Sequence, residues 1–189
     1  MIVIKLGGSL AYADTLTDCL DTIEQRYQGK DVVIVPGGGA FADQVRLAQQ
    51  HWRFDDRTAH RMAILAMQQM ALLCNGLKAD FAVIHSVAAI KAQSQQNKIL
   101  IWSPACDELD HAGIQASWDI TSDSLAAWLG DALSATELIL VKSADVDVES
   151  GLQQLAAQGI VDRAFCGFVA QAAFQIRIVN QHHFREGHR

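Results

Sequence analysis

Residues 2–10 read IVIKLGGSL and decide how the rest of the chain is organised. The β-branched run is typical of a buried strand, and Gly7 and Gly8 allow a tight turn in which the backbone can approach a ligand. Exposed N–H groups in such a turn attract anions, and Lys5 adds a positive charge at the strand end. Because positioning and charge neutralisation provide most of the catalysis of phosphoryl transfer, the stretch favours a phosphate-facing turn. A buried strand with an ordinary turn would show the same pattern.

Length and composition indicate one globular domain. The chain has 189 residues, half of them hydrophobic, and no stretch approaches the roughly 18 apolar residues of a membrane-spanning helix. We predict no signal peptide, and the four scattered cysteines form no C-x-x-C pair, so reduced thiols in a cytoplasmic protein are expected. A net charge of −6 without a basic patch argues against a nucleic-acid partner.

A βαβ unit begins with the first strand. Asp14 and Thr15 are candidate caps of a helix whose apolar residues recur at helical spacing and which ends near Gly29. Residues 31–35 form a continuous apolar run, which predicts a strand buried on both faces. A strand, a helix and a second strand within about 35 residues predict two parallel strands.

Three glycines follow this second strand. Gly37, Gly38 and Gly39 would lie between its carboxyl end and a helix, where backbone N–H groups meet anionic or polar ligands. We rank a loop for an acceptor substrate first, a plain turn second and a dinucleotide-binding loop third. The dinucleotide fingerprint requires a further strand and an acidic residue downstream, and the sequence does not provide them in that arrangement.

A long helix is predicted from Asp55 or Asp56 to about Cys74. It is apolar on most of its circumference, so it should be central, and its methionines are expected to fill the core. His60 and Arg61 are polar exceptions near its start. They are either a capped or exposed pair or residues that recognise an acceptor, and the sequence leaves both interpretations open.

Shorter elements are expected after this helix. The predicted elements are strands at 81–84 and 99–102, a polar helical stretch around 93–97, a solvated loop at 107–111, a helix at 163–174 and a strand at 175–180. The chain then ends in a segment that we interpret as a frayed polar tail, with His182, His183 and His188.

A second informative motif spans residues 118–130. Thr121 or Ser122 can cap a helix there, which places Asp123 in the first turn, where the helix dipole favours a carboxylate. Capping alone would explain these residues. Asp119 and Asp123 nevertheless flank a turn and could both face a cleft, where a carboxylate could orient the reactive lysine.

A second lysine ends another apolar run. Residues 137–142 predict a buried strand that closes with Lys142, and Ser143, Asp145 and Asp147 follow it. A lysine at the carboxyl end of a strand, followed by small and acidic residues, again fits a phosphate-facing loop.

Four motifs in this order resemble the amino acid kinase superfamily, which includes acetylglutamate, aspartate, uridylate and isopentenyl phosphate kinases. They are Lys5-x-Gly-Gly-Ser, the three glycines after the second strand, Asp119-x-x-x-Asp123-x-Leu-Ala, and Asp145-Val-Asp147. The resemblance covers almost the whole chain. Residues 59–67 further resemble a short archaeal and methylotroph branch, whose known activity is phosphorylation of an aminomethylfuran phosphate during methanofuran synthesis.

The resemblance implies an α/β fold, a three-layer α/β/α sandwich around a mostly parallel sheet. An acceptor-substrate lobe at residues 1–117 and a nucleotide-binding lobe at residues 118–189 would share one continuous sheet. It further implies an ATP- and Mg²⁺-dependent kinase that acts on a small phosphate or carboxylate acceptor. We expect a cytoplasmic homo-oligomer without nucleic-acid or membrane partners.

The motifs and the resemblance together imply a role for each candidate residue. Lys5 would bridge the transferring phosphoryl group and Asp123 would orient Lys5. The phosphoryl group would further be bound by Gly7, Gly8 and Ser9. The acceptor would be bound by Gly37, Gly38, Gly39, His60 and Asp119. The nucleotide would be bound by Lys142, Ser143, Asp145 and Asp147.

One departure from the family pattern concerns a second catalytic lysine. The family's Gly-Gly-Met-x-x-Lys segment is missing, and residues 159–165 read GIVDRAF in its place. We predict that Lys142 reaches the nucleotide phosphates and partly replaces this lysine. Arg163 is the alternative source of the charge. The opposing interpretation is that Lys142 points into solvent. The competing functions are a non-catalytic nucleotide- or oxyanion-binding protein on the same fold and a Rossmann-type oxidoreductase.

Overall fold

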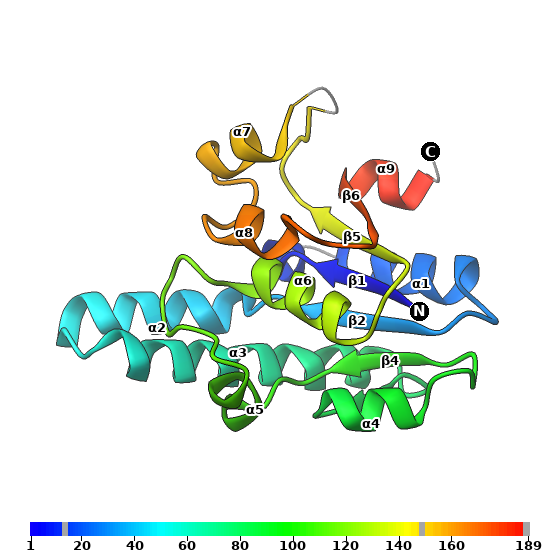
Figure 1. The fold of residues 1–189 in the computed structure, drawn as a ribbon, viewed down its shortest axis with the longest axis horizontal. Helices are drawn as coiled ribbons and strands as arrows, with labels where there is room; N and C mark the ends of the chain where they lie inside the picture. Colours follow the sequence, from blue (N-terminus) through cyan, green and yellow to red (C-terminus); the bar gives the residue numbers. More distant parts are fainter. Residues whose placement is uncertain (13–14, 148–149, 187–189) are drawn as a thin grey trace.

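The computed structural model describes residues 1–12, 15–147 and 150–186, which form a three-layer α/β/α sandwich (Figure 1). Six parallel strands make one continuous sheet in the order β3-β4-β2-β1-β5-β6. The strands are β1 (Ile2–Leu6), β2 (Val32–Pro36), β3 (Ala82–Ile84), β4 (Ile99–Trp102), β5 (Glu137–Lys142) and β6 (Gln175–Asn180). The helices are the 3-10 helix η1 (Gly8–Tyr12) and the α-helices α1 (Thr15–Arg26), α2 (Gly39–Trp52), α3 (Asp56–Leu77), α4 (Val87–Ala92), α5 (Cys106–His111), α6 (Ser122–Ala132), α7 (Leu152–Ala157), α8 (Phe165–Val169) and α9 (Gln181–Glu186). Two residues discussed above, Asp14 and His188, lie outside the described residues.

Strand β1 lies at the centre of the sheet. It pairs with β2 on one side and with β5 on the other, so that Lys5 is aligned with Val35 and with Leu140. Because all strands run in the same direction, the turns that follow β1, β2 and β5 meet at one edge of the sheet. Ligands of open α/β sheets bind at this carboxyl edge.

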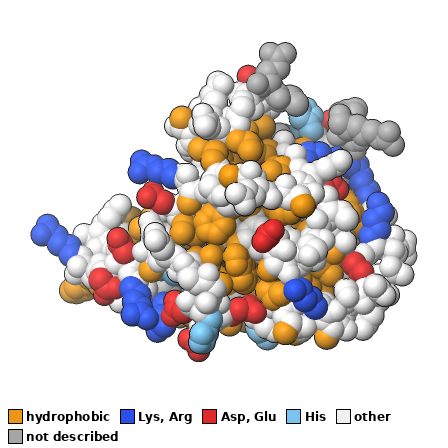
Figure 2. Space-filling view, in the orientation of Figure 1, with side chains coloured by type: hydrophobic (Ala, Val, Ile, Leu, Met, Phe, Trp, Pro, Cys, Tyr) orange, Lys and Arg blue, Asp and Glu red, His pale blue; other side chains and the backbone are white. Residues whose placement is uncertain are grey.

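The two faces of the sheet carry separate hydrophobic cores. On one face Ile4 and Leu6 pack with Leu20 of α1 and Phe184 of α9. On the other face the alternate residue Val3 packs with Leu125 and its neighbours on α6. The alternation along β1 buries both faces, as expected for a central parallel strand. Figure 2 shows hydrophobic side chains gathered over the middle of the face that carries α6, with charged side chains around them.

Helices explain most differences from the predicted elements. The prediction of a polar helical stretch at 93–97 was wrong. The helix in this region is α4, which begins earlier because Ser86 caps it, and Gln95 and Asn97 have the non-helical φ values of 67° and 54°. The solvated loop at 107–111 was also wrong, since these residues belong to α5. The helix predicted over 163–174 is reduced to the five residues of α8, and α7 was not predicted.

The carboxyl-terminal segment is docked rather than frayed. His182 and His183 belong to α9, whose Phe184 is 5% exposed in the core against α1. The Arg26 guanidinium donates hydrogen bonds to the carbonyl oxygens of Phe184, at 2.7 Å, and of Arg185. None of the described helices combines the length and the apolar character that a membrane crossing requires.

Candidate functional site

Two glycine turns pack backbone against backbone at the carboxyl edge of the sheet. A Cβ placed on Gly8 would lie 2.4 Å from the nitrogen of Gly39, and one placed on Gly37 would lie 2.6 Å from the nitrogen of Gly8. Real Cβ atoms do not approach other atoms this closely, so both turns require glycine. Gly39 also has a φ of +54° at the start of α2. The turn after β1 and the turn after β2 are therefore one composite surface of bare backbone.

The Gly7 N–H group is already used within the sheet. It donates a hydrogen bond to the carbonyl oxygen of Val141 at 3.0 Å, which ties the turn after β1 to the end of β5. The expectation that this N–H binds a phosphoryl group is therefore corrected, because its hydrogen is not available in this structure. Gly8 lines a cavity, and its role with the phosphoryl group stays a prediction.

Three buried charged side chains meet beside the glycine turns. The Lys5 Nζ lies 2.9 Å from Asp123 Oδ1, and the Lys142 Nζ lies 2.8 Å from Asp123 Oδ1 and 2.6 Å from Oδ2. Lys5, Asp123 and Lys142 are 4%, 3% and 8% exposed. The neighbouring strands β1 and β5 bring the two lysines together, and the amino-terminal turn of α6 supplies the carboxylate. Lys142 therefore does not face solvent.

This cluster, Lys5–Asp123–Lys142, leaves one positive charge in a buried place. Burial alone would raise the pKa of Asp123, but the ammonium groups of Lys5 and Lys142 outweigh it and hold this pKa below its usual value. Burial, followed by repulsion from Lys5, lowers the pKa of Lys142 to about 8, and Asp123 opposes that shift. A buried charge without a partner is unfavourable, so the cluster is suited to an anionic ligand.

The first turn of α6 is held by a carboxylate from outside the helix. Asp162 accepts hydrogen bonds from the Thr121 and Ser124 backbone N–H groups, at 2.9 and 3.0 Å, and from both side-chain hydroxyl groups. The Asp162 N–H in turn donates to Asp123 Oδ2 at 3.3 Å. Neither Thr121 nor Ser122 therefore caps the helix with its own side chain as predicted, and Asp162 positions the turn that carries Asp123.

We expect Asp162→Ala to destabilise the protein. The substitution leaves the N–H and hydroxyl groups of the fully buried Ser124 without an acceptor. Loss of an N-cap typically lowers the free energy of unfolding by about 0.5–2 kcal/mol, and we expect a value toward the upper end of this range. Chemical denaturation of both proteins measures it. Asp119→Ala is the matched control, because Asp119 is exposed and its 3.5 Å pair with Arg163 should contribute less than about 1 kcal/mol. Equal stability losses in the two variants would contradict the capping role.

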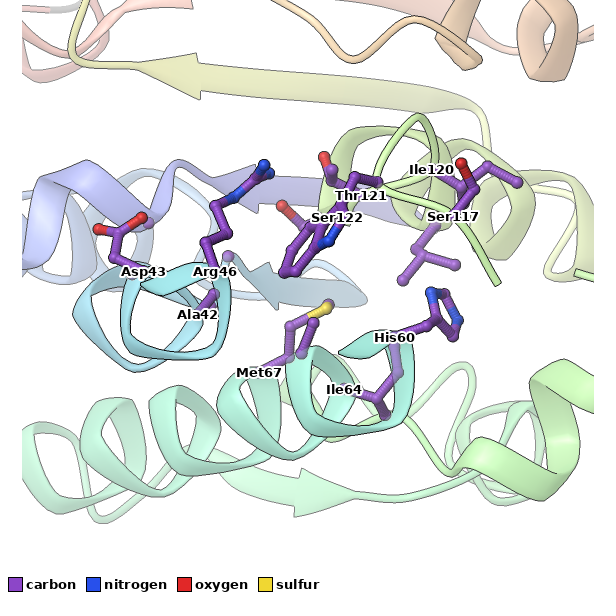
Figure 3. A pocket seen from close by; sticks show the side chains of 17 residues that line it. Ala42, Asp43, Arg46, His60, Ile64, Met67, Ser117, Ile120, Thr121 and Ser122 are labelled. Atoms are coloured by element: carbon purple, nitrogen blue, oxygen red, sulfur yellow. The ribbon is translucent and has the colours of Figure 1, made fainter. Parts of the chain in front are cut away.

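Two cavities lie next to the segment that leads into α6, and the second of them contains two members of the cluster. The first, of about 180 Å³, is formed by the glycine turns, by α2 and α3, and by the segment that leads into α6 (Figure 3). His60, Ile64 and Met67 point into it from α3. The second cavity, of about 560 Å³, contains Asp123 and Lys142 and is bounded by the end of α7 and residues 159–163.

The structure separates the residues predicted to bind the acceptor. Gly37, Gly38, Gly39 and His60 all line the first cavity. Burial lowers the pKa of His60, and the charge of Asp110 partly opposes this shift. Asp119 lies instead in the lining of the second cavity, where its exposed carboxylate pairs with Arg163. Asp119 is therefore apart from the other four residues, and its role with the acceptor stays a prediction.

The residues that follow β5 make contacts of their own. The Ser143 hydroxyl lies 2.7 Å from the hydroxyl of Ser9, which joins the turns after β5 and β1. Asp145 accepts a hydrogen bond from the Asn180 amide at 3.2 Å, and Asp147 accepts one from the Ser150 hydroxyl at 3.4 Å. None of these three residues lines either cavity, so their nucleotide-binding roles stay predictions.

Comparison with known proteins decides the family. The model of the Amino acid kinase family matches residues 1–147. The chain belongs to the amino acid kinase family. A relative from Methanocaldococcus jannaschii, [5-(aminomethyl)furan-3-yl]methyl phosphate kinase, is 32% identical over 149 residues, which cover 77% of this chain and 67% of the relative. An acetylglutamate kinase from Bacillus cereus is 26% identical over 186 residues, with 79% and 71% of the two chains covered.

Solved structures of two uridylate kinases share the fold. Uridylate kinase from Archaeoglobus fulgidus superposes with a TM-score of 0.76 at 17% identity, over 98% of this chain and 94% of that one. UMP kinase from Ureaplasma parvum gives a TM-score of 0.71 at 17% identity, over 95% and 88% of the two chains. The predicted family, the three-layer fold and the assignment as a small-molecule kinase are confirmed. The oxidoreductase alternative was wrong.

Sequence reasoning missed three residues of the candidate site. Asp162 was seen only as part of the segment that replaces the family's lysine motif. Arg46 and Trp118 were assigned no role, although both line the two cavities. Arg46 lies in the middle of an ordinary amphipathic helix, and only the packing of α2 against the 117–121 segment reveals its position.

Proposed function

We propose that this kinase transfers the γ-phosphoryl group of ATP to a small acceptor that bears a phosphate or a carboxylate. The observation that carries the proposal is the buried Lys5–Asp123–Lys142 cluster with its single net positive charge. The cluster lies at the carboxyl edge of the sheet, beside a turn of bare glycine backbone. Phosphoryl transfer needs positioned cations around the transferring group and little other chemistry from the protein.

Each member of the cluster takes a separate part. The Lys5 ammonium, at the end of β1, faces the transferring phosphoryl group from the side of the glycine turns. Lys142 lines the second cavity and faces the nucleotide phosphates. Asp123 holds both ammonium groups in place and, as a carboxylate that is already saturated with cations, does not itself repel the phosphates.

The acceptor is assigned to the first cavity. Its volume of about 180 Å³ suits a small molecule, and apolar side chains of α3 and α6 alternate in its lining with His60 and the glycine turns. The M. jannaschii relative is named for an aminomethylfuran phosphate, which combines a small ring with a phosphate. We therefore place this compound first among candidate acceptors, with a role in methanofuran synthesis, and acetylglutamate-like carboxylates second.

Magnesium is assigned to the nucleotide rather than to the protein. Within the described ranges no group of three His, Cys, Asp or Glu side chains is arranged to hold a metal ion. Asp123 is occupied by two lysines. Mg²⁺ keeps several waters and binds readily to substrate phosphates, so it would arrive with ATP.

The assembly is proposed to be a cytoplasmic homo-oligomer in which residues 1–117 bind the acceptor and residues 118–189 bind the nucleotide. The two cavities divide largely along this boundary. Helix α3 exposes an apolar stripe that another subunit would cover, and its large members are Leu65, Leu72, Leu73 and Leu77.

A second candidate is a nucleotide- or oxyanion-binding protein without catalysis. It is favoured by residues 159–163, which bring the carboxylate of Asp162 to the α6 terminus in the segment where the family's second lysine was expected. Incubation with Mg²⁺–ATP and each candidate acceptor, followed by ³¹P NMR and ADP release, separates the two. Transfer to an acceptor supports the kinase, whereas nucleotide binding without any phosphorylated product supports the binding protein.

We expect nucleotide binding to take up a proton at Lys142. Its pKa is about 8 in the free protein, so near pH 8 roughly half of these ammonium groups are neutral, and nearby phosphates raise the pKa. Calorimetric titrations with Mg²⁺–ADP, in buffers of different ionisation enthalpy, should show uptake of up to about half a proton at pH 8 and little at pH 6.5. Lys142→Met should abolish the uptake. The same uptake in this variant would remove Lys142 from the nucleotide site.

A further inference from the structure

Arg46 occupies the junction of the two cavities. The linings of the cavities have three residues in common, which are Arg46, Trp118 and Thr121. Arg46 extends from α2 toward the side of the first cavity that carries Thr121 (Figure 3). A group that passes from a nucleotide in the second cavity to an acceptor in the first therefore passes beside this guanidinium.

An aromatic stack holds Arg46 in this place. Its guanidinium carbon lies 3.9 Å from the ring centroid of Trp118. The indole N–H donates a hydrogen bond to the Gln49 side-chain oxygen at 2.6 Å, and Gln49 lies one turn further along the same helix. A guanidinium that is held over an aromatic ring keeps N–H groups that can bind phosphate oxygens.

Arg46 forms no ion pair with any carboxylate of the described residues. Among the described residues, no Asp or Glu oxygen lies within 4.0 Å of a nitrogen of Arg46, and nearby Asp43 accepts a hydrogen bond from Tyr12. The other exposed cation of the second cavity, Arg163, is paired with Asp119 and does not line the first cavity. Within the part of the chain that the structure describes, Arg46 is thus the arginine that has no ion pair and lines both cavities.

We propose that Arg46 is a third catalytic cation, which contacts the γ-phosphoryl group during its transfer. The inference rests on the proposed function. In that step an acceptor oxygen forms a bond to the γ-phosphorus, the bond from this phosphorus to the β–γ bridging oxygen breaks, and ADP leaves. Arg46 donates N–H groups to the equatorial oxygens, because the Lys5–Asp123–Lys142 cluster by itself supplies only one net positive charge against several negative ones. The charge lost with the family's second lysine is restored from α2.

The test uses the purified protein and two nucleotides, Mg²⁺–ADP and the Mg²⁺ complex of a non-hydrolysable ATP analogue with a nitrogen between the β and γ phosphorus atoms. Arg46→Met should weaken binding of the analogue by roughly tenfold or more and change ADP binding by less than about threefold, because only the analogue carries a γ-phosphoryl group. Arg57→Met is the matched control, because Arg57 is an exposed arginine at the start of α3 that lines neither cavity, so both affinities should stay near the wild-type values. Arg46→Lys keeps the charge without the stacked fork and should fall between wild type and Arg46→Met.

Each other outcome overturns the assignment. Unchanged binding of the analogue by Arg46→Met removes Arg46 from the phosphoryl group. An equal loss for both nucleotides, in Arg46→Lys as well as Arg46→Met, assigns it to the structure of α2. One such outcome is that the wild type transfers a phosphoryl group while Arg46→Met has the wild-type turnover and the wild-type ratio of analogue affinity to ADP affinity. In that case the inference about Arg46 fails and the proposed function stands. If the wild type binds neither nucleotide, the proposed function fails with it.

Discussion

Lys5→Ala is expected to lower kcat by a factor of about 10²–10³, the usual loss when one charge-stabilising donor is removed from an active site. The fold should survive, because removal of the Lys5 ammonium leaves Asp123 paired with Lys142 in a neutral buried ion pair. Steady-state rates with Mg²⁺–ATP and the acceptor identified by ³¹P NMR measure the loss. Thermal melting of the same samples measures the stability.

The matched control for this variant is Lys91→Ala, because Lys91 is an exposed lysine of α4 and lies in neither cavity lining. It should keep the wild-type rate and melting temperature. Full activity in Lys5→Ala would show that residues 2–10 have only a structural role, as a strand and a turn. A variant that is both inactive and unfolded would show instead that Lys5 is needed for the core.

Asp123→Asn is expected to damage both stability and catalysis. It leaves two ammonium groups buried side by side without their carboxylate, a loss that in comparable buried pairs amounts to about 3–5 kcal/mol. Without the carboxylate neither lysine is held in place, so kcat should fall as well. If Asp123 acted only as an acidic residue in the first turn of α6, the loss would be about 0.3–1 kcal/mol with unaltered turnover.

The pH dependence of stability identifies the cause of the loss. The pKa of Lys142 in the folded protein, about 8, lies below the value near 10.4 of an unfolded lysine, so between these values the unfolded chain binds more protons and stability from this group rises with pH. In Asp123→Asn the pKa of Lys142 should fall further, which starts the rise at a lower pH. Urea unfolding from pH 7 to pH 9.5 should therefore show the deficit of the variant shrinking. A deficit independent of pH would contradict unpaired lysines as its cause.

The sequence predicted those parts of the fold and of the candidate site that depend on a single strand and the turn that follows it. The βαβ order, the strands and the glycine turns are local patterns, and parallel strands necessarily bring their carboxyl ends together. Asp123 was placed beside Lys5 through the resemblance to the amino acid kinases. That Asp123 serves Lys142 as well depends on β5 lying next to β1, a strand order that the local pattern does not contain.

Other parts depend on packing between distant segments. Asp162 reaches Thr121 and Ser124 across about 40 residues of sequence, and no periodicity marks a carboxylate that caps another segment's helix. Arg46 meets Trp118 in the same way, through the docking of α2. The carboxyl-terminal segment was predicted to be frayed because it contains polar residues such as His182 and His183 and only one large apolar residue, Phe184. In the structure Phe184 is buried, and the segment forms α9.

One measurement tests the central claim most directly, which is that the Lys5–Asp123–Lys142 cluster catalyses phosphoryl transfer from ATP. The wild-type protein is mixed with γ-³²P-labelled ATP, Mg²⁺ and [5-(aminomethyl)furan-3-yl]methyl phosphate or acetylglutamate, and the label is followed in single-turnover reactions beside Lys5→Ala. The account predicts label in one of the acceptors with the wild type, and a rate lower by about 10²–10³ in the variant. Bound ATP whose label stays on the nucleotide in both proteins, with every acceptor, would contradict it.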